Sequence, residues 1–280
     1  MQQATSTTPQ FLKVKERVSE IRARYEEGSS NTVNLLVIGD YGTGKTQLAS
    51  TCPTPIFIDS FDPGGTKTRA LQPMIKKGDI IVDDQWETDS WKRPGAFRQW
   101  EKDMEQRMKE GFFEHFSWYL LDSATKWAMS MMFEILSKAG RAGKGPQIQA
   151  YLVQQLTAAD WLGQLMDLPC NVMVTGHIGV DKDEVTGKME TGLLMWGKLA
   201  QQVPLVFDEK YVCRVDQKSS GPEHKLLTKN DGMYKAETRM GGDLFSQFED
   251  MNIRTLLKKA GKPSEDKPSL VEKMNDESPA

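Results

Sequence analysis

The chain has 280 residues, of which 38% are hydrophobic and 27% charged, and its formal net charge is -3. This length suffices for one large α/β domain, and the charge excludes the global basic field that often marks nucleic-acid-binding proteins. No apolar run approaches the roughly 20 residues of a membrane span. The first ten residues lack the basic and then apolar order of a signal peptide, so we expect a cytoplasmic protein without membrane contact.

The three cysteines, Cys52, Cys170 and Cys213, are odd in number and widely spaced, and no C-x-x-C pair occurs. This pattern supports neither a disulfide framework nor a zinc site.

The N-terminal segment, residues 1–30, combines a polar tail with an amphipathic helix. Residues 1–10 are polar and predicted to be disordered. Apolar residues then follow a 3-4-3-4 spacing that places them on one side of a helix: Phe11, Val14, Val18, Ile21 and Tyr25. Two interpretations stay open, packing on the chain's own domain and packing against a neighbouring subunit in a ring or filament.

Residues 34–46 read NLLVIGDYGTGKT, and the apolar run at 35–38 predicts a buried strand. Gly39 opens the pattern G-x-x-x-x-G-K-S/T, which Gly44, Lys45 and Thr46 close. Glycines let backbone N–H groups approach phosphate oxygens, and the helix expected to start there points its positive end at the anion. Lys45 is placed to reach the β- and γ-phosphates, and the Thr46 hydroxyl to reach Mg²⁺. The predicted nucleotide-binding residues are Gly39, Asp40, Tyr41, Gly42, Thr43, Gly44, Lys45, Thr46 and Gln47.

Two acids follow the second predicted strand, residues 56–58. Asp59 and Asp62 precede a Pro-Gly-Gly turn at residues 63–65, at the sheet edge where open α/β sheets bind ligands. One of them is a candidate to orient the water that attacks the γ-phosphate. A helix-capping or turn role fits these residues equally well.

The middle of the chain predicts further alternating elements and a metal-binding acid. Asp122 directly follows an apolar strand and precedes a helix, which is the usual position of the carboxylate that holds Mg²⁺ opposite a phosphate loop. The expected elements are helices at 66–77, 95–109 and 124–138, strands at 80–82 and 116–121, and an acidic loop at 83–94 that contains Trp86 and Trp91.

A glycine-rich loop at residues 139–146 follows, with Lys138, Arg141 and Lys144 in or beside it. Mobile backbone with interspersed cations suits contacts to the phosphates of a single strand. No aromatic residue lies inside this loop for base stacking, so the argument is electrostatic only. A plain solvated connector is the alternative.

After a helix at 147–167 and a strand at 171–175, His177 stands at a strand end, where it could hydrogen-bond the γ-phosphate and report its loss. The alternative is a polar residue without such a role. Residues 179–197 form a second candidate moving loop, with Lys182 and Lys188 as possible DNA contacts.

Short alternating strands at 212–215, 225–228 and 234–236 predict an antiparallel extension of the sheet. Lys229 and Arg239 lie beside it and could reach a γ-phosphate in the same or an adjacent subunit, as an arginine finger does. A solvated surface position is the alternative for both. Residues 257–280 are polar and charged and are expected to form a flexible tail.

Taken together, GDYGTGKT, FIDSFDPGG, YLLDSAT, VTGH and the late Lys229 and Arg239 resemble the RecA-like core of strand-exchange ATPases. The phage-encoded RecA-like proteins, including the Sak-type single-strand annealing ATPases, look most similar. The resemblance implies an α/β fold over residues 31–256, with a mainly parallel central sheet, helices on both faces and an antiparallel C-terminal extension.

The resemblance also implies roles for individual residues. Lys45 and Thr46 would bind phosphate and Mg²⁺, Asp122 would support the metal, and His177 would occupy the sensor position. The loops after the Asp122 helix and after His177 would face DNA, and subunits would assemble with ATP between them. In the recombinases a glutamate two residues after the strand-end Asp is the usual base, but Phe61 stands there in this chain and Asp62 is the candidate substitute.

The leading hypothesis is a Mg²⁺-dependent ATPase that acts on single-stranded DNA in phage recombination or annealing, in the cytoplasm of a bacterial host. Its expected partners are single-stranded DNA, further copies of itself in a ring or filament, and a single-strand-binding protein or other phage recombination factor. Two alternatives belong to other classes, an assembly module that binds ATP with little turnover and a P-loop phosphotransferase acting on a small molecule. The second would need a lid with several arginines, and the loop around Arg141 has one.

Overall fold

The computed structural model describes residues 9–28, 32–182, 189–219 and 221–271. It divides the chain into two units, residues 1–32 and residues 33–280. The first unit contains one long helix, α1 (Pro9–Gly28). Its apolar side chains Phe11, Val14, Val18 and Ile21 are 45%, 56%, 49% and 50% exposed. The expected disorder of residues 1–10 concerns residues that lie mostly outside the described part.

A ten-stranded sheet organises the second unit. The strands follow the order β10-β8-β7-β1-β5-β4-β2-β3, with β6 paired to β5 and β9 to β7. All pairs among β7, β1, β5, β4, β2 and β3 are parallel, and those made by β6, β8, β9 and β10 are antiparallel. The bounds are β1 (Asn34–Gly39), β2 (Ile56–Ser60), β3 (Ile80–Asp83), β4 (Trp118–Asp122), β5 (Asn171–Lys182), β6 (Met189–Leu193), β7 (Glu209–Lys218), β8 (Gly221–Leu227), β9 (Glu237–Thr238) and β10 (Phe248–Asp250).

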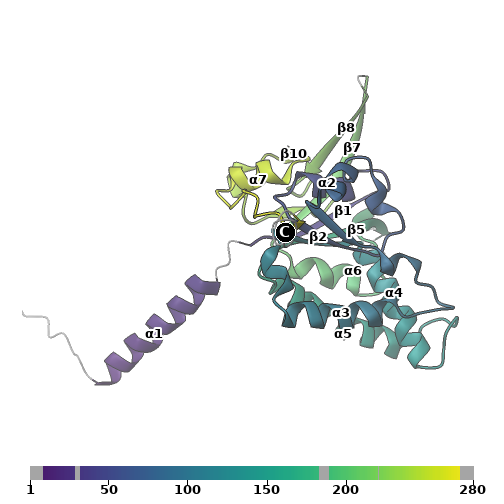
Figure 1. Cartoon of the computed structure of the whole chain (residues 1–280), viewed down its shortest axis with the longest axis horizontal. Coiled ribbons are helices and arrows are strands. Elements are labelled where there is room, and N and C mark those ends of the chain that lie inside the picture. Colours follow the sequence, from purple (N-terminus) through teal and green to yellow (C-terminus); the bar gives the residue numbers. More distant parts are fainter. Residues whose placement is uncertain (1–8, 29–31, 183–188, 220, 272–280) are drawn as a thin grey trace, which may run out of the picture. The chain divides into compact units, whose positions relative to one another are not determined.

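Helices cover both faces of this sheet (Figure 1). The sequence of β1 is continuously apolar because both faces of the strand are buried. Leu36 and Ile38 pack into a hydrophobic core on one side of the sheet, and Leu35 and Val37 pack into a second core on the other side. Such burial on both sides is typical of the central strands of parallel sheets. The helices of the second unit are α2 (Gln72–Lys77), α3 (Ala96–Lys109), α4 (Ala124–Lys138), α5 (Ile148–Met166), α6 (Leu199–Gln202) and α7 (Ile253–Lys259).

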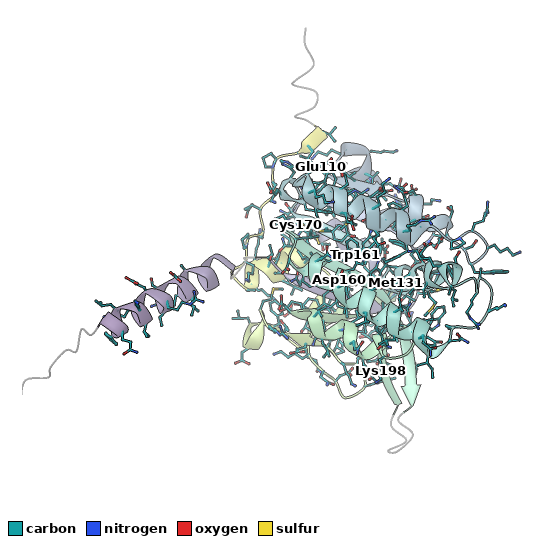
Figure 2. The ribbon with its side chains drawn as sticks, turned by 90° about the horizontal axis from the view of Figure 1, so that it is seen from below. Glu110, Met131, Asp160, Trp161, Cys170 and Lys198 are labelled. Atoms are coloured by element: carbon teal, nitrogen blue, oxygen red, sulfur yellow. The ribbon has the colours of Figure 1, made fainter. Side chains whose placement is uncertain are left out.

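The larger core lies between the sheet and the layer formed by α3, α4 and α5. It is rich in aromatic side chains, with Trp100 of α3, Trp127 of α4 and Trp161 of α5 in ring-to-ring contact at 4.9 to 5.7 Å between centroids. Figure 2 views this layer from below and labels Met131 of α4 and Trp161 of α5. No helix among the described residues is long and apolar enough to span a membrane.

The expected fold class is confirmed: a mainly parallel central sheet, helices on both faces and an antiparallel C-terminal extension. The parallel register places the carboxyl ends of four strands along one edge. Gly39 of β1 lies opposite His177 of β5, and Ser60 of β2 lies opposite Asp122 of β4. The strand ends that carry most of the candidate residues are therefore neighbours.

The helix after Lys45 is short, as expected from Pro53 and Pro55, and it is a six-residue 3-10 segment, Thr46–Thr51. Two local expectations farther along the chain were wrong in detail. Within the expected loop at 179–197, the described residues 179–182 and 189–193 form two antiparallel strands instead, since β5 continues to Lys182 and pairs with β6. Residues 183–188 lie outside the described part of the chain. The third predicted strand of the extension, 234–236, lies at residues 237–238 as β9.

The expected flexible tail from residue 257 is also wrong for residues 257–271. Leu257 is 1% exposed, and the Arg254 guanidinium of α7 binds the Asp266 carboxylate at 2.6 Å. The backbone N–H of Lys267 donates to the Thr54 carbonyl oxygen at 2.8 Å. This segment therefore packs beside the start of β2.

Candidate nucleotide-binding site

The phosphate loop is a tight turn between β1 and the 3-10 segment. Gly42 and Gly44 have φ angles of 75° and 92°, a region that side chains disfavour. A Cβ at Gly39 would lie 2.5 Å from the Thr43 hydroxyl oxygen, and that hydroxyl donates to the Asp40 carbonyl oxygen at 2.8 Å. The glycines thus permit the close backbone approach that the sequence pattern predicts.

Lys45 is only 7% exposed. Its ammonium Nζ donates to the carbonyl oxygens of Gly39 at 2.9 Å and Asp40 at 2.8 Å, so the side chain folds back over its own loop. Burial lowers the pKa of Lys45, although the negative charges of Asp122 and Asp62 oppose this. The loop therefore holds a buried ammonium group that is hydrogen-bonded only to neutral carbonyl oxygens. An anion such as a phosphate would form a stronger, charge-assisted hydrogen bond with it.

Asp122 lies opposite the phosphate loop, at the end of β4, and is 1% exposed. One carboxylate oxygen accepts from the Thr46 hydroxyl at 2.8 Å, and the other accepts from the Thr175 hydroxyl. Burial raises the pKa of Asp122, and the two hydroxyl donors act in the opposite direction. A Cβ at Gly65 would lie 2.9 Å from the Asp122 Oδ2 atom, so a glycine is needed beside this pair.

The oxygen donors of Thr46 and Asp122 fit Mg²⁺, which is usually bound by one or two protein oxygens together with substrate phosphates. Within the described residues there is no group of three or more His, Cys, Asp or Glu that could hold a metal by itself. In the same part of the chain the fully buried Ser123 hydroxyl, next to Asp122, has no hydrogen-bond partner. The donor set of Thr46 and Asp122 therefore suits a metal held jointly with a phosphate ligand.

A second pair links Asp62, just past the end of β2, with His177, which lies within β5 and not at a strand end as expected. The His177 Nε2 atom lies 2.8 Å from the Asp62 Oδ2 atom, and the two side chains are 23% and 26% exposed. This hydrogen bond is the main reason that the pKa of Asp62 is lowered. The backbone N–H of Asp62 also donates to the Asp122 carbonyl oxygen at 3.1 Å. Lys45, Thr46, Asp62, Asp122 and His177 are therefore gathered at one edge of the sheet.

Asp59 does not belong to this group, which corrects the prediction that it acts in catalysis. It is fully buried, and its carboxylate accepts hydrogen bonds from four side chains of the helical layer and sheet at 2.9 to 3.1 Å: Trp86, Trp100, Arg107 and Tyr119. Burial raises the pKa of Asp59, although Arg107 opposes it. A carboxylate with every lone pair so engaged cannot orient a water molecule.

Arg239 does not reach the phosphate loop of its own chain. It follows β9, which pairs with Glu209 at the start of β7, and Glu209 lies opposite Leu35 at the start of β1. The phosphate loop leaves the other end of β1, and Arg239 binds Asp208 at 3.0 Å. The same-chain role of Arg239 is wrong, and its role in an adjacent subunit stays a prediction. Lys229 follows β8, and both roles stay predictions for it.

The predicted DNA-binding cations lie on two separate segments. Lys138 pairs with Glu134 at 3.4 Å, the Arg141 guanidinium donates to the Gly145 carbonyl oxygen at 3.3 Å, and Lys144 is exposed. Lys188 and the side chain of Lys182 lie outside the described part of the chain. A contact to DNA stays a prediction for all five.

Sequence reasoning missed two neighbours of the site. Thr175, whose hydroxyl binds Asp122, could have been identified as a candidate site residue, because it is a polar residue within an apolar strand. His224 gave no such signal: it comes from β8, far along the chain, and its Nδ1 atom lies 3.2 Å from the Thr43 carbonyl oxygen. The antiparallel extension therefore borders the phosphate loop, which only the strand pairing shows.

The sheet topology and the arrangement of Lys45, Thr46 and Asp122 define a P-loop nucleoside triphosphatase domain. The sequence model of the AAA_24 family, described as an AAA domain, matches residues 31–240. The chain belongs to this AAA-domain family. No curated protein matches it. Among solved structures, it is similar to a KaiC-like protein from the hyperthermophilic archaeon Pyrococcus horikoshii OT3, with 12% identity over 70% of this chain and 77% of that chain and a TM-score of 0.39.

Proposed function

We propose that this protein binds and hydrolyses ATP with Mg²⁺ and uses the nucleotide state to control self-assembly and its hold on single-stranded DNA, in phage recombination or annealing of the Sak type. One observation carries the nucleotide part of the proposal: Asp62 and His177 form a hydrogen-bonded pair beside the Lys45, Thr46 and Asp122 group. The site thus combines groups for phosphate and metal with an acid and a candidate sensor.

The residues divide the chemistry between them. Lys45 and the loop amides would hold the triphosphate, and Thr46 and Asp122 would hold Mg²⁺, which neutralises charge on the phosphates. Asp62 is the candidate to orient the attacking water, because it is a partly exposed carboxylate beside the groups for phosphate and metal. Its hydrogen bond to His177 fixes the carboxylate's direction.

His177 also offers a route from the nucleotide to the rest of the molecule. Its carbonyl oxygen accepts from the Leu194 backbone N–H at 2.8 Å, and Ile178 lies opposite Leu193 in the β5–β6 hairpin. A change in the contacts of His177 when the γ-phosphate leaves would therefore shift this hairpin. Such differential contacts in the ATP and ADP states are what a nucleotide-driven change in DNA grip requires.

The test is a phosphate-release assay with and without single-stranded oligodeoxynucleotide. We expect DNA to stimulate the wild type, and Lys45→Ala to lose turnover by about a hundredfold or more because phosphate charge is no longer neutralised. Arg69→Ala, an exchange of another cation of the same unit outside the site, serves as the matched control. The proposal is refuted if Lys45→Ala hydrolyses ATP as fast as the wild type. It is also refuted if DNA changes neither the hydrolysis rate nor the oligomeric state of the wild type.

The same assay separates the alternatives. ATP binding without turnover, with oligomers that persist, would identify an assembly module. Transfer of label from ATP to a small molecule would identify a phosphotransferase. Electron micrographs with an ATP analogue, with and without single-stranded DNA, would distinguish a monomer, ring and filament.

A further inference from the structure

Trp91 stands at the tip of a tight turn and is 49% exposed. Ser90 and Arg93 form an antiparallel bridge, and the Arg93 backbone N–H donates to the Ser90 carbonyl oxygen at 3.0 Å. Trp91 and Lys92 are the two residues between them. An exposed tryptophan on so short a turn has little conformational freedom to lose when it binds a ligand.

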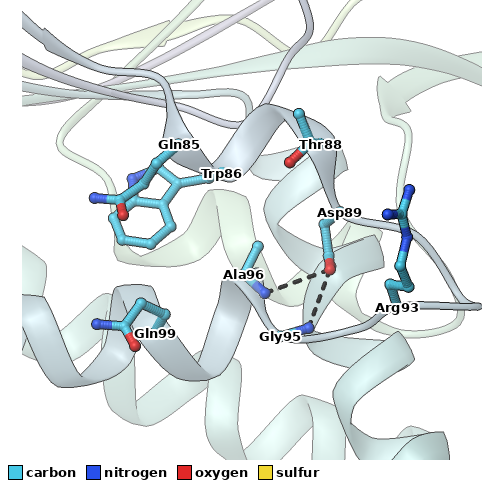
Figure 3. Close-up of a pocket in the computed structure, with 8 residues that line it drawn as sticks. All are labelled: Gln85, Trp86, Thr88, Asp89, Arg93, Gly95, Ala96 and Gln99. Atoms are coloured by element: carbon cyan, nitrogen blue, oxygen red, sulfur yellow. Dashed lines mark hydrogen bonds between the residues drawn. The ribbon is translucent and has the colours of Figure 1, made fainter.

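Asp89 fixes this turn to the helical layer. Its Oδ1 atom accepts from the backbone N–H groups of Gly95 at 3.1 Å and Ala96 at 3.3 Å, at the start of α3 (Figure 3). Its Oδ2 atom accepts from the Ser130 hydroxyl of α4. The carboxylate thereby ties both ends of the segment to two helices, so the position of Trp91 is built into the fold.

The glycine-rich loop packs directly against this tryptophan. A Cβ at Gly143 would lie 2.6 Å from the Trp91 ring, and Gly143 has a φ of 74°. The loop contains no aromatic residue of its own, and the tertiary structure supplies one from a segment some fifty residues earlier. We call the turn 90–93 together with Gly143 the Trp91 platform.

The charge around the Trp91 platform is opposite to that of the whole chain. The whole protein has a net charge of -3, but residues 90–98 and 138–147 contain no acid. They contain six cations: Lys92, Arg93, Arg98, Lys138, Arg141 and Lys144. Glu134 pairs with Arg98 and Lys138. Lys92 lies 5.4 Å from the centroid of the Trp91 ring. An exposed aromatic among cations is the arrangement with which proteins bind single-stranded nucleic acid.

A cavity of about 530 Å³ adjoins the turn, with Arg93 and the amide side chains of Gln85 and Gln99 in its wall (Figure 3). Amide groups both donate and accept hydrogen bonds, so they match the edge of an unpaired base. The cavity therefore gives room beside the Trp91 platform for part of a nucleotide.

We propose that Trp91 is a stacking platform for an unpaired base of a single-stranded polynucleotide whose phosphates lie along the cations of residues 90–98 and 138–147. This inference rests on the proposed function, because it specifies how the strand is held. It adds an aromatic contact, from the segment between β3 and α3, to the DNA-binding site that the cations of the glycine-rich loop predict.

The first experiment measures fluorescence anisotropy of labelled 30-residue oligo-dT, oligo-U and an abasic oligomer of equal length, at fixed salt with ATP analogue. Trp91→Ala should weaken binding of the base-containing strands by about tenfold or more, since loss of one base–aromatic stack has that effect. Trp91→Phe should keep most of the affinity. The abasic strand should bind wild type and Trp91→Ala equally, and Phe248→Ala, which removes another exposed aromatic, should bind like the wild type.

A second experiment uses two glycines of one loop. Gly143 and Gly140 both have positive φ, at 74° and 65°, but a Cβ at Gly140 would meet nothing within 4 Å. Gly143→Ala and Gly140→Ala therefore suffer similar backbone strain, and only the first displaces the Trp91 ring. We expect Gly143→Ala to lose affinity for oligo-dT and Gly140→Ala to retain it.

The outcomes are distinguishable. If the wild type binds none of the three strands, the DNA part of the proposed function fails and this inference fails with it. If the wild type binds oligo-dT and Trp91→Ala binds it equally well, only the stacking role is refuted. If Trp91→Ala changes the sedimentation of the protein without DNA but not its DNA affinity, Trp91 contacts protein and the inference is wrong.

Discussion

Asp59 and Asp62 stand three residues apart at one strand end and have different surroundings. Asp59 lies within β2 and joins the helical layer, where it accepts from two tryptophans, a tyrosine and an arginine. Asp62 lies past the strand end, partly exposed beside His177. For these two residues, the position relative to the strand end determines which carboxylate is available to a ligand.

We predict that Asp59→Ala lowers the free energy of unfolding by about 3–5 kcal/mol. The exchange removes the acceptor of three buried donors, Trp86, Trp100 and Tyr119, and leaves Arg107 with the Asp83 carboxylate alone. Chemical denaturation monitored by tryptophan fluorescence would measure this change. Asp84→Ala, which removes an exposed acid of the following segment, should be nearly neutral. Unchanged stability together with lost turnover would show instead that Asp59 acts in catalysis.

At the scale of whole elements, α1 is the helix whose packing the described structure leaves open. Four apolar side chains at helical spacing are about half exposed, and the helix forms a unit by itself. An apolar stripe of this length is unusual on a solvated helix. A second copy of the chain is the partner that the proposed self-assembly requires.

We therefore predict that Val14→Asp with Val18→Asp lowers the oligomeric mass in the presence of ATP analogue, since burying two carboxylates in an apolar contact is costly. Light scattering after size exclusion would measure the mass. Glu16→Lys reverses a charge on the opposite side of the helix and should leave assembly intact. Equal masses for all three proteins would place the subunit contact elsewhere.

At the scale of the whole molecule, the nucleotide site joins distant parts of the chain. The phosphate loop, Asp62, Asp122 and His177 come from four strands, and His224 approaches from the antiparallel extension. A ligand that contacts all these strands binds only the folded state. Its binding free energy must therefore add to the stability of the entire second unit.

We predict that a slowly hydrolysed ATP analogue with Mg²⁺, at about a hundredfold its Kd, stabilises the wild type by about 2.7 kcal/mol. For a domain of this size this corresponds to a rise in Tm of about 5–10 °C. Differential scanning fluorimetry would measure it. Lys45→Ala should lose the shift, chelation of Mg²⁺ should reduce it, and Lys144→Ala should keep it. An equal shift in Lys45→Ala would mean that the analogue binds elsewhere.

The phosphate loop and the fold class are predictable from the residues alone, because both depend on local rules. The order of Gly39, Gly44, Lys45 and Thr46 implies a turn, and the apolar runs imply strands buried on both faces. The position of Asp122 follows from the same rules, since parallel strands end at one edge of the sheet.

The polar residues that contact one another are identified only in the folded chain. The register of β7 and β9 sends Arg239 to the far edge of the sheet, the packing of α3 engages Asp59, and the contact with Gly143 brings Trp91 to the cationic loop. Each outcome depends on strand pairing or helix packing between segments far apart in the chain. Local sequence patterns do not predict such contacts. The energy of each contact depends on a partner residue that comes close only when the chain folds.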